Sequence, residues 1–294
     1  MTLAFKDRVE SIMEYLPTAP AMLPKLLETL HNENSTIQDL ESIINKDPSL
    51  TVNILRLANS AFYSLSYKVT SVDKAVAIIG FERLKSLCVA HMCGKSLFPS
   101  KNECSVDSLS YWSHSLATGA IAKALCMEAG MAPLETLNTM GLIHDIGVVI
   151  LDRFFHNIYK MIVELTYEEN VSLYDVEIRT LSVSHATVGG WLLQQWKLPE
   201  EYVEVASYHH AVNQAPEKNR LQIAIVSLAD EIARLKGFGI GGDKSGTIIA
   251  DTEAFSVIKQ HSTSIGDTDL ARFVMDLDRE DNGILKLGKM IDGS

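Results

Sequence analysis

The sequence predicts an all-helical fold, and two observations carry that prediction. Apolar residues recur at three- and four-residue steps through most of the chain, as in "STIQDLESIINKD" (residues 35–47), which places them on one face of a helix. No convincing alternation of apolar and polar residues is found, although a half-buried strand requires it. The β-branched segments "VAIIG" (76–80) and "IGVVIL" (146–151) lie inside longer helical patterns, so the alternative of two strands is disfavoured.

Residues with known preferences for helix ends mark the expected boundaries. Ser35, with a glutamine three residues on, forms a capping-box pattern. Asp47 before a proline is typical of a helix start, because aspartate accepts free N–H groups and proline fits the first helical position. Asn59 is expected to bond backbone groups where that helix ends. Ser71 should begin the next helix, and Gly80 should end it.

Two polar breaks divide the chain into three expected parts. Residues 98–107 combine proline, small polar residues and charges, and residues 236–246 are rich in glycine. We therefore predict an N-terminal helical lobe over residues 1–100, a second helical lobe over 101–240 and a C-terminal helical extension over 241–294. The second break contains a GxGxxG pattern, but it follows a helix instead of a strand, so it predicts a helix-ending loop and not a dinucleotide site.

The composition excludes several classes of protein. The 294 residues carry a net charge of −11 and no long basic run, which argues against nucleic-acid binding, since affinity for phosphates depends on positive charge. The four cysteines form no CxxC pair and are expected to be reduced thiols of a cytoplasmic protein. No apolar segment approaches the roughly 20 residues that a membrane span needs. A soluble protein is expected.

Five histidines and two aspartates are each expected on the face of a helix that otherwise looks buried: His114, His144, Asp145, His185, His209, His210 and Asp230. A lone histidine on an apolar helix is usually a hydrogen-bonded core residue. Two buried aspartates, however, are costly without partners, and a divalent metal ion would satisfy the whole set through imidazole nitrogen and carboxylate oxygen. Seven candidate ligands exceed what one metal ion with open positions needs, so the set suggests two ions with Asp145 between them.

The ligand types limit which metal ion is expected. The set contains no cysteine, which argues against a closed structural zinc site. Nitrogen and oxygen ligands suit iron, manganese, nickel, zinc or magnesium. We expect one or two divalent ions and favour iron or manganese.

The order of these seven residues resembles the HD superfamily of metal-dependent phosphohydrolases. In its HD-GYP branch the resemblance implies that all seven positions are metal ligands. The segments "LPTAPAMLPKLLETL" (16–30), "DPSLTVNILRLANSAFY" (47–63) and "HATVGGWLLQQWKLPEEYVEVASYHH" (185–210) resemble HDOD-domain proteins more specifically. That resemblance spans about residues 16–239. It implies an all-helical protein, with an N-terminal lobe packed against an HD-like lobe, that works in bacterial signalling and regulation.

The chain departs from the hydrolase pattern at two places. Phosphodiesterase relatives usually read HDIGK, whereas Val148 stands at the lysine position and cannot stabilise developing negative charge. The Gly-Tyr-Pro loop after the histidine pair is replaced by "AVNQAPEKNRL" (211–221), in which Lys218 and Arg220 are the candidate substitutes.

Two functions remain open. The favoured one is a regulatory module that binds other signalling proteins, with a small nucleotide as a further candidate ligand, and that retains its metal. The alternative is a metal-dependent phosphohydrolase acting on a nucleotide or cyclic dinucleotide. No catalytic residue is assigned beyond Asp145, which would be essential if the protein is an enzyme.

Overall fold

The computed structural model describes residues 16–32, 34–59, 63, 65–97, 105–131, 136–240, 248–262, 265 and 270–277. All regular secondary structure in these residues is helical, so the predicted all-helical fold is confirmed. The two β-branched segments belong to helices α5 (Val72–Ile79) and α9 (Ile146–Glu169). Within the described ranges, no helix is long and apolar enough to cross a membrane.

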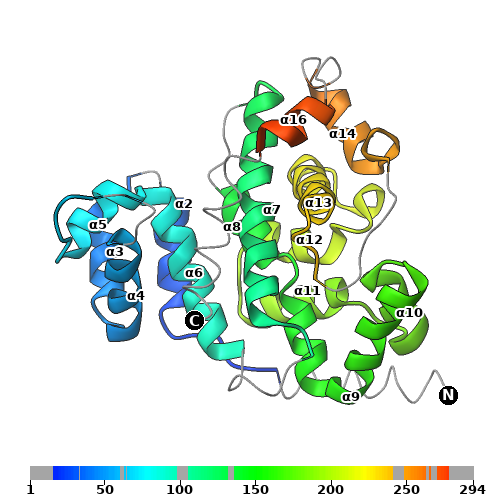
Figure 1. The fold of residues 1–294 in the computed structure, drawn as a ribbon, viewed down its shortest axis with the longest axis horizontal. Helices are drawn as coiled ribbons and strands as arrows, with labels where there is room; N and C mark the ends of the chain where they lie inside the picture. Colours follow the sequence, from blue (N-terminus) through cyan, green and yellow to red (C-terminus); the bar gives the residue numbers. More distant parts are fainter. Residues whose placement is uncertain are drawn as a thin grey trace.

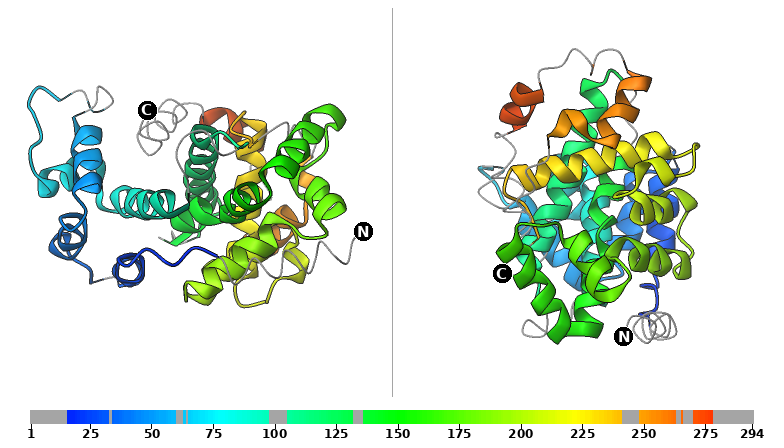
Figure 2. Two further views of the ribbon diagram at one scale, coloured as in Figure 1. Left: turned by 90° about the horizontal axis from the view of Figure 1, so that it is seen from below. Right: turned by 90° about the vertical axis from the view of Figure 1, so that its right-hand side faces the viewer.

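The helices of the first part of the chain gather on one side of the molecule (Figure 1). They are α2 (Leu23–His31), α3 (Ile37–Ile44), α4 (Pro48–Ala58), α5 and α6 (Phe81–Leu97). The apolar faces of α3, α4 and α5 pack together through fully buried residues, among them Leu40, Ile43 and Leu57. In the left view of Figure 2, α6 runs from this group towards the remaining helices.

Most of the predicted helix ends in this part are confirmed. Asp47 is the N-cap of α4, and its carboxylate accepts the backbone N–H groups two and three residues on, at 3.0 and 3.3 Å. Ser71 occupies the N-cap of α5. Gly80 ends α5 with a φ of 92°, a left-handed value that glycine adopts without a steric penalty.

The capping box before α3 lies one residue later than predicted. Thr36, and not Ser35, is the N-cap, and Asp39 completes the box by accepting the Thr36 backbone N–H at 2.9 Å. The Ser35 hydroxyl instead donates to the Thr29 carbonyl at 2.6 Å. Ser35 and Thr36 both carry a hydroxyl group that could cap α3. The Ser35 hydroxyl is used within the turn between α2 and α3, so Thr36 is the cap.

Asn59 ties the end of α4 to the segment that follows it. Its side-chain amide donates to the carbonyls of Leu55 at 2.7 Å and Val69 at 2.8 Å, and its Oδ1 accepts the Val69 N–H at 2.7 Å. The predicted backbone-bonding role is therefore confirmed.

Asn59→Ala is expected to lower the free energy of unfolding by about 2–3 kcal/mol, since each lost hydrogen bond contributes on the order of 1 kcal/mol. Urea unfolding followed by circular dichroism would measure this loss. Asn53→Ala is the matched control, because the Asn53 amide makes one long contact of 3.4 Å to His91. Equal losses in the two variants would contradict the role of Asn59.

The second part of the chain forms a larger helical group (Figure 1). Its helices are α7 (Ser108–Glu128), α8 (Thr136–Ile143), α9, α10 (Leu173–Leu181), α11 (His185–Gln195), α12 (Glu200–Tyr208) and α13 (Arg220–Leu235). The long helix α7 packs along α8 and α13, and α11 packs against α9 and α12. The contact of α7 with α13 brings together segments that are about 100 residues apart in the chain.

The last described segments cover one end of this group. They are the short helix η3 (Ile249–Asp251), α14 (Glu253–His261) and α16 (Leu270–Asp276), and α14 packs on α13. The glycine-rich break follows α13, as predicted, and Gly237 adopts a φ of 84° there. Residues 241–247 of this break, and 98–104 of the first one, lie outside the described residues.

Glycines allow four of these helices to approach at backbone distance. A Cβ on Gly141 of α8 would lie 2.6 Å from the Cα of Gly119 in α7. A Cβ on Gly147 of α9 would lie 2.0 Å from the carbonyl oxygen of His185 and 2.6 Å from the N of Gly189, both in α11. Real Cβ atoms do not make contacts this short, so these positions require glycine.

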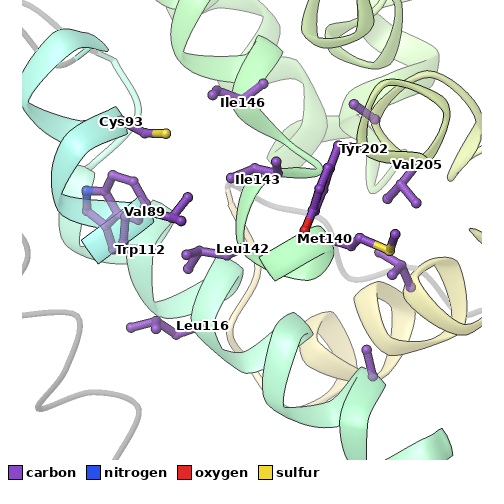
Figure 3. Close-up of a cluster of buried hydrophobic side chains, with 14 of the residues drawn as sticks. Val89, Cys93, Trp112, Leu116, Met140, Leu142, Ile143, Ile146, Tyr202 and Val205 are labelled. Carbon is purple, nitrogen blue, oxygen red and sulfur yellow. The ribbon is translucent and has the colours of Figure 1, made fainter. Parts of the chain in front are cut away.

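A cluster of buried apolar side chains holds the turn between α8 and α9. Ile143 and Ile146 stand on either side of that turn, and Figure 3 shows them between the side chains of α6 and α7 and those of α12. The other labelled members are Val89, Cys93, Trp112, Leu116, Met140, Leu142, Tyr202 and Val205. Because the core is continuous from α6 to α12, the position of the turn is set by packing from both parts of the chain.

Candidate metal centre

The seven predicted site residues meet at one place in the second helical group. Only His114 in α7 and Asp230 in α13 lie inside helices. The others stand at helix ends: His144 and Asp145 form the two-residue turn between α8 and α9, His185 is the first residue of α11, and His209 and His210 follow α12. The expectation that all seven lie on helix faces is therefore wrong, while their gathering is as predicted.

Four of the residues form a fully buried set, called here the deep group: His114, His144, Asp145 and Asp230. The Nε2 atoms of His114 and His144 each lie 3.3 Å from Asp145 Oδ2. Asp230 Oδ1 lies 3.1 Å from His114 Nε2 and 3.7 Å from His144 Nε2. Two imidazoles and two carboxylates thus point their donor atoms at a common centre.

A second set, called here the pocket-facing group, shares Asp145 with the first: Asp145, His185, His209 and His210. Asp145 Oδ1 lies 3.2 Å from His185 Nε2 and 3.3 Å from His209 Nε2. His185 Nε2 lies 3.0 Å from His210 Nε2. In each group the donor atoms lie within 4.8 Å of one another, and the two oxygens of Asp145 face different groups.

Four of the histidines use Nδ1, the ring nitrogen that points away from the centre, in a hydrogen bond. The Nδ1 atoms of His114, His144 and His209 lie 2.8, 2.7 and 2.9 Å from the backbone carbonyls of Phe238, Gly141 and Ala206. His185 Nδ1 lies 2.7 Å from Glu177 Oε2. Carbonyl and carboxylate oxygens accept these hydrogen bonds, so each of these Nδ1 atoms carries a proton, and Nε2 is the ring nitrogen that faces the centre and would bind a metal ion. This is the usual arrangement of histidines that bind a metal ion.

Several atoms that face the centre are buried and lack the polar partner that a bound cation would provide. His114 Nε2, His144 Nε2, Asp145 Oδ1 and Asp230 Oδ1 are buried and have no hydrogen-bond partner. Buried polar atoms without partners are costly. Here three of them meet in the deep group, and the fourth, Asp145 Oδ1, faces the pocket-facing group. The residues present therefore fit a divalent metal ion, with nitrogen and oxygen ligands that suit a transition metal.

The charges within the centre keep its carboxylates ionised. Burial raises the pKa of Asp145, but His144 and His185 outweigh it and hold that pKa well below its usual range. Burial acts in the same direction on Asp230, and Arg234 more than reverses it. In turn, burial lowers the pKa of His144, but the Asp145 carboxylate overcomes this and raises it to about 10. Ionised carboxylates are what metal coordination requires.

Glu177 and Arg234 belong to this centre although the sequence pattern did not reveal them. The Glu177 side chain is fully buried and accepts hydrogen bonds from the Tyr159 hydroxyl, the His185 backbone N–H at 2.7 Å and His185 Nδ1. Arg234 Nη2 lies 2.6 Å from Asp230 Oδ2. The four-residue step from Asp230 to Arg234 was a usable signal. Glu177 left none, because its partners come from other segments.

Glu177→Gln is expected to weaken metal binding by the pocket-facing group about 10- to 100-fold, because His185 loses the charged acceptor that orients it. Metal titration followed by calorimetry would measure this. Glu169→Gln is the control, since Glu169 is a half-exposed residue paired with Arg179 at 2.6 Å. A variant that binds as tightly as the control would show that Glu177 only fills space.

A pocket of about 560 Å³ opens beside the pocket-facing group. It is lined by His209, His210, Val212, Ser227, Glu231, Ile248, Asp251, Thr252, Glu253 and Ala254. Three of these residues are acidic, and no lysine or arginine is among the described residues that line it. Lys218 is not among them, and Arg220 donates to the Ala215 carbonyl at 2.7 Å instead. Val148, at the lysine position of the hydrolase pattern, is fully buried in the core.

An all-helical fold with two overlapping His/Asp groups defines a protein of the HD class. The model of the HDOD domain family matches residues 16–212, and the chain belongs to that family. The match ends before α13, so Asp230 and Arg234 lie beyond it.

Three solved structures share the fold. An HDOD domain protein of unknown function from Geobacter sulfurreducens is 25% identical, with a TM-score of 0.78 over 99% of this chain and 98% of its own. A Marinobacter aquaeolei protein, provisionally named a signal transduction protein, is 19% identical, with a TM-score of 0.80 over 99% of this chain and 66% of its own. A Shewanella amazonensis protein, provisionally named a phosphohydrolase, is 24% identical, with a TM-score of 0.69 over 96% and 97%.

The curated relatives that the chain matches are uncharacterised proteins, from Treponema pallidum at 25% identity and from Bacillus subtilis at 34% over 61 residues. The chain spans 44% and 15% of their lengths. These relatives are thus longer proteins of which this chain resembles one part.

Proposed function

We propose that this protein is an HDOD regulatory module that holds one or two divalent metal ions, iron or manganese, in its His/Asp centre and acts by binding. The proposed ligands are the seven residues of the deep and pocket-facing groups, and the proposed partners are other signalling proteins. The proposal keeps the three-part division at residues 1–100, 101–240 and 241–294. It is supported by membership of the HDOD family and by the four buried atoms of the centre that have no hydrogen-bond partner. The strongest support is the negative charge of the side chains that line the adjoining pocket.

The pocket is poorly suited to a phosphate ester. Enzymes that transfer or hydrolyse phosphate groups place positive side chains where negative charge develops. Here Glu231, Asp251 and Glu253 line the space next to His209 and His210. Carboxylates in that position repel an approaching phosphate, which favours binding or sensing over turnover.

The second candidate is a metal-dependent phosphohydrolase that acts on a nucleotide or cyclic dinucleotide. The completeness of both four-residue groups favours it. A divalent metal ion would supply a nucleophile for a phosphate ester at neutral pH. The chain itself would contribute Asp145, whose two oxygens face the two groups, and the four Nδ1 hydrogen bonds that fix the imidazole rings.

The two candidates are separated by metal analysis together with a hydrolysis assay. The protein is purified with and without exclusion of oxygen, its metal content is measured, and it is then incubated with a panel of cyclic and linear nucleotides. We expect bound transition metal and no turnover. Turnover that Asp145→Ala abolishes would establish the enzyme instead. Absence of metal from both preparations, and failure to take it up on titration, would overturn the metal centre.

A further inference from the structure

Arg234 contacts the deep group from one turn further along α13. Its Nη2 lies 2.6 Å from Asp230 Oδ2 and 2.9 Å from Glu231 Oε1. The side chain is only 8% exposed, although an arginine side chain seldom lies so far from water unless it is paired. A buried pair of this kind fixes the geometry of both partners.

Because of this pair, the two oxygens of Asp230 have different neighbours. Oδ2 is held by Arg234, whereas Oδ1 lies 3.1 Å from His114 Nε2 and has no hydrogen-bond partner. A cation in the deep group therefore meets one oxygen of Asp230 and not both. Asp145 also presents one oxygen, Oδ2, to this group, because its Oδ1 faces His185 and His209.

The number of carboxylate oxygens that the protein supplies affects calcium most. Calcium takes six to eight oxygen ligands and often binds both oxygens of a carboxylate, whereas imidazole nitrogen suits transition metals. With both carboxylates limited to one oxygen, the deep group offers two oxygens and two nitrogens. This donor set suits a transition metal and disfavours calcium.

We propose that Arg234 is a positioning residue that determines the metal specificity of the deep group. By holding Asp230 Oδ2, it keeps Asp230 a one-oxygen ligand and so favours a divalent transition metal over calcium. This inference depends on the proposed metal centre. The pocket-facing group does not include Asp230, so the positioning of Asp230 by Arg234 concerns the deep group.

The test compares two ions of equal charge on metal-stripped protein. Removing the guanidinium charge of Arg234 should raise the affinity for Mn²⁺ and Ca²⁺ alike, so the ratio of the two affinities isolates the geometric effect. Competitive equilibrium dialysis measures this ratio, with metal quantified by mass spectrometry. We expect Arg234→Gln to lower the Mn²⁺/Ca²⁺ preference about 10-fold, the lower end of the effect of removing a residue that supports a ligand. Arg234→Lys should give an intermediate value.

Glu231→Gln is the matched control, because it removes the other partner of Arg234 Nη2 and leaves the pair with Asp230 intact. It should keep the wild-type preference. Thermal unfolding of each metal-free variant reports whether it folds. If Arg234→Gln does not fold, Arg234→Lys decides, since it retains the charge.

A folded variant with the wild-type Mn²⁺/Ca²⁺ ratio would overturn the role of Arg234 while the metal centre stands. A wild-type protein that binds neither ion would overturn the metal centre itself, and the role of Arg234 with it. The two failures are therefore distinguishable in one experiment.

Discussion

Asp145→Ala is expected to remove metal from both groups at once, lowering affinity well beyond the 10- to 100-fold effect of losing a residue outside the ligand set. Asp145 is the residue that the two groups share. Its Oδ2 lies 3.3 Å from His114 Nε2, and its Oδ1 lies 3.2 Å from His185 Nε2. No other residue of the seven has this position. Metal content after titration with Mn²⁺ and dialysis would measure the loss, and His210→Ala should spare the deep group.

Asp152→Asn is the control for the removal of a buried carboxylate in general. Asp152 is fully buried in α9, the helix that follows Asp145, but its Oδ2 accepts the Val106 N–H at 2.8 Å and it belongs to neither group. The control should retain metal even if its stability falls. Asp145→Asn, which keeps the volume of the side chain, separates loss of the charge from loss of packing. Normal metal content in both Asp145 variants would contradict the assignment of the centre.

Gly147→Ala is expected to destabilise the protein by at least about 3 kcal/mol, the upper end of the usual cost of overpacking. The new Cβ would lie 2.0 Å from the carbonyl oxygen of His185 and 2.6 Å from the N of Gly189. Both are backbone atoms, so α9 and α11 must separate to relieve the clash. That movement displaces His185 from Asp145, and metal affinity should fall together with stability.

Gly189→Ala tests the same contact from its other side. Its Cβ would meet the N of Gly147 at 3.2 Å, which small shifts can relieve, and alanine is favoured over glycine inside a helix by up to about 1 kcal/mol. Chemical denaturation of both variants measures the difference. A Gly147 variant no less stable than the Gly189 variant would rule out the close approach as a requirement of the fold.

The helices of this protein are largely local in origin, which is why the sequence predicted them. Three features depend only on neighbouring residues, and the structure confirms them: the spacing of apolar residues three and four positions apart, the Asp47 cap and the end of α5 at Gly80. The one-residue error at Ser35 arose where two hydroxyl residues compete for one cap. Local preference does not separate them, and the packing of α2 on α3 does.

The sequence predicted which residues gather at the candidate site, but not which parts of the fold hold them there. Seven polar residues in apolar surroundings, in the order of a known family, identified which side chains gather. The placement of five of them at helix ends was not expected. The turn at His144 and Asp145, for example, is made by packing around Ile143 and Ile146 and by glycine contacts between helices. Those contacts join residues far apart in the chain.

The sequence by itself determined the all-helical fold, the helix ends and the set of donors, since each depends on residue type and on short-range spacing. Only the tertiary structure decided that Asp145 divides its oxygens between two groups, that Glu177 contacts His185 and Arg234 contacts Asp230, and that three carboxylates line the adjoining pocket. The physical reason is that charge and donor geometry act through space over a few ångströms. Residues about 100 positions apart meet at that distance only when the helices pack.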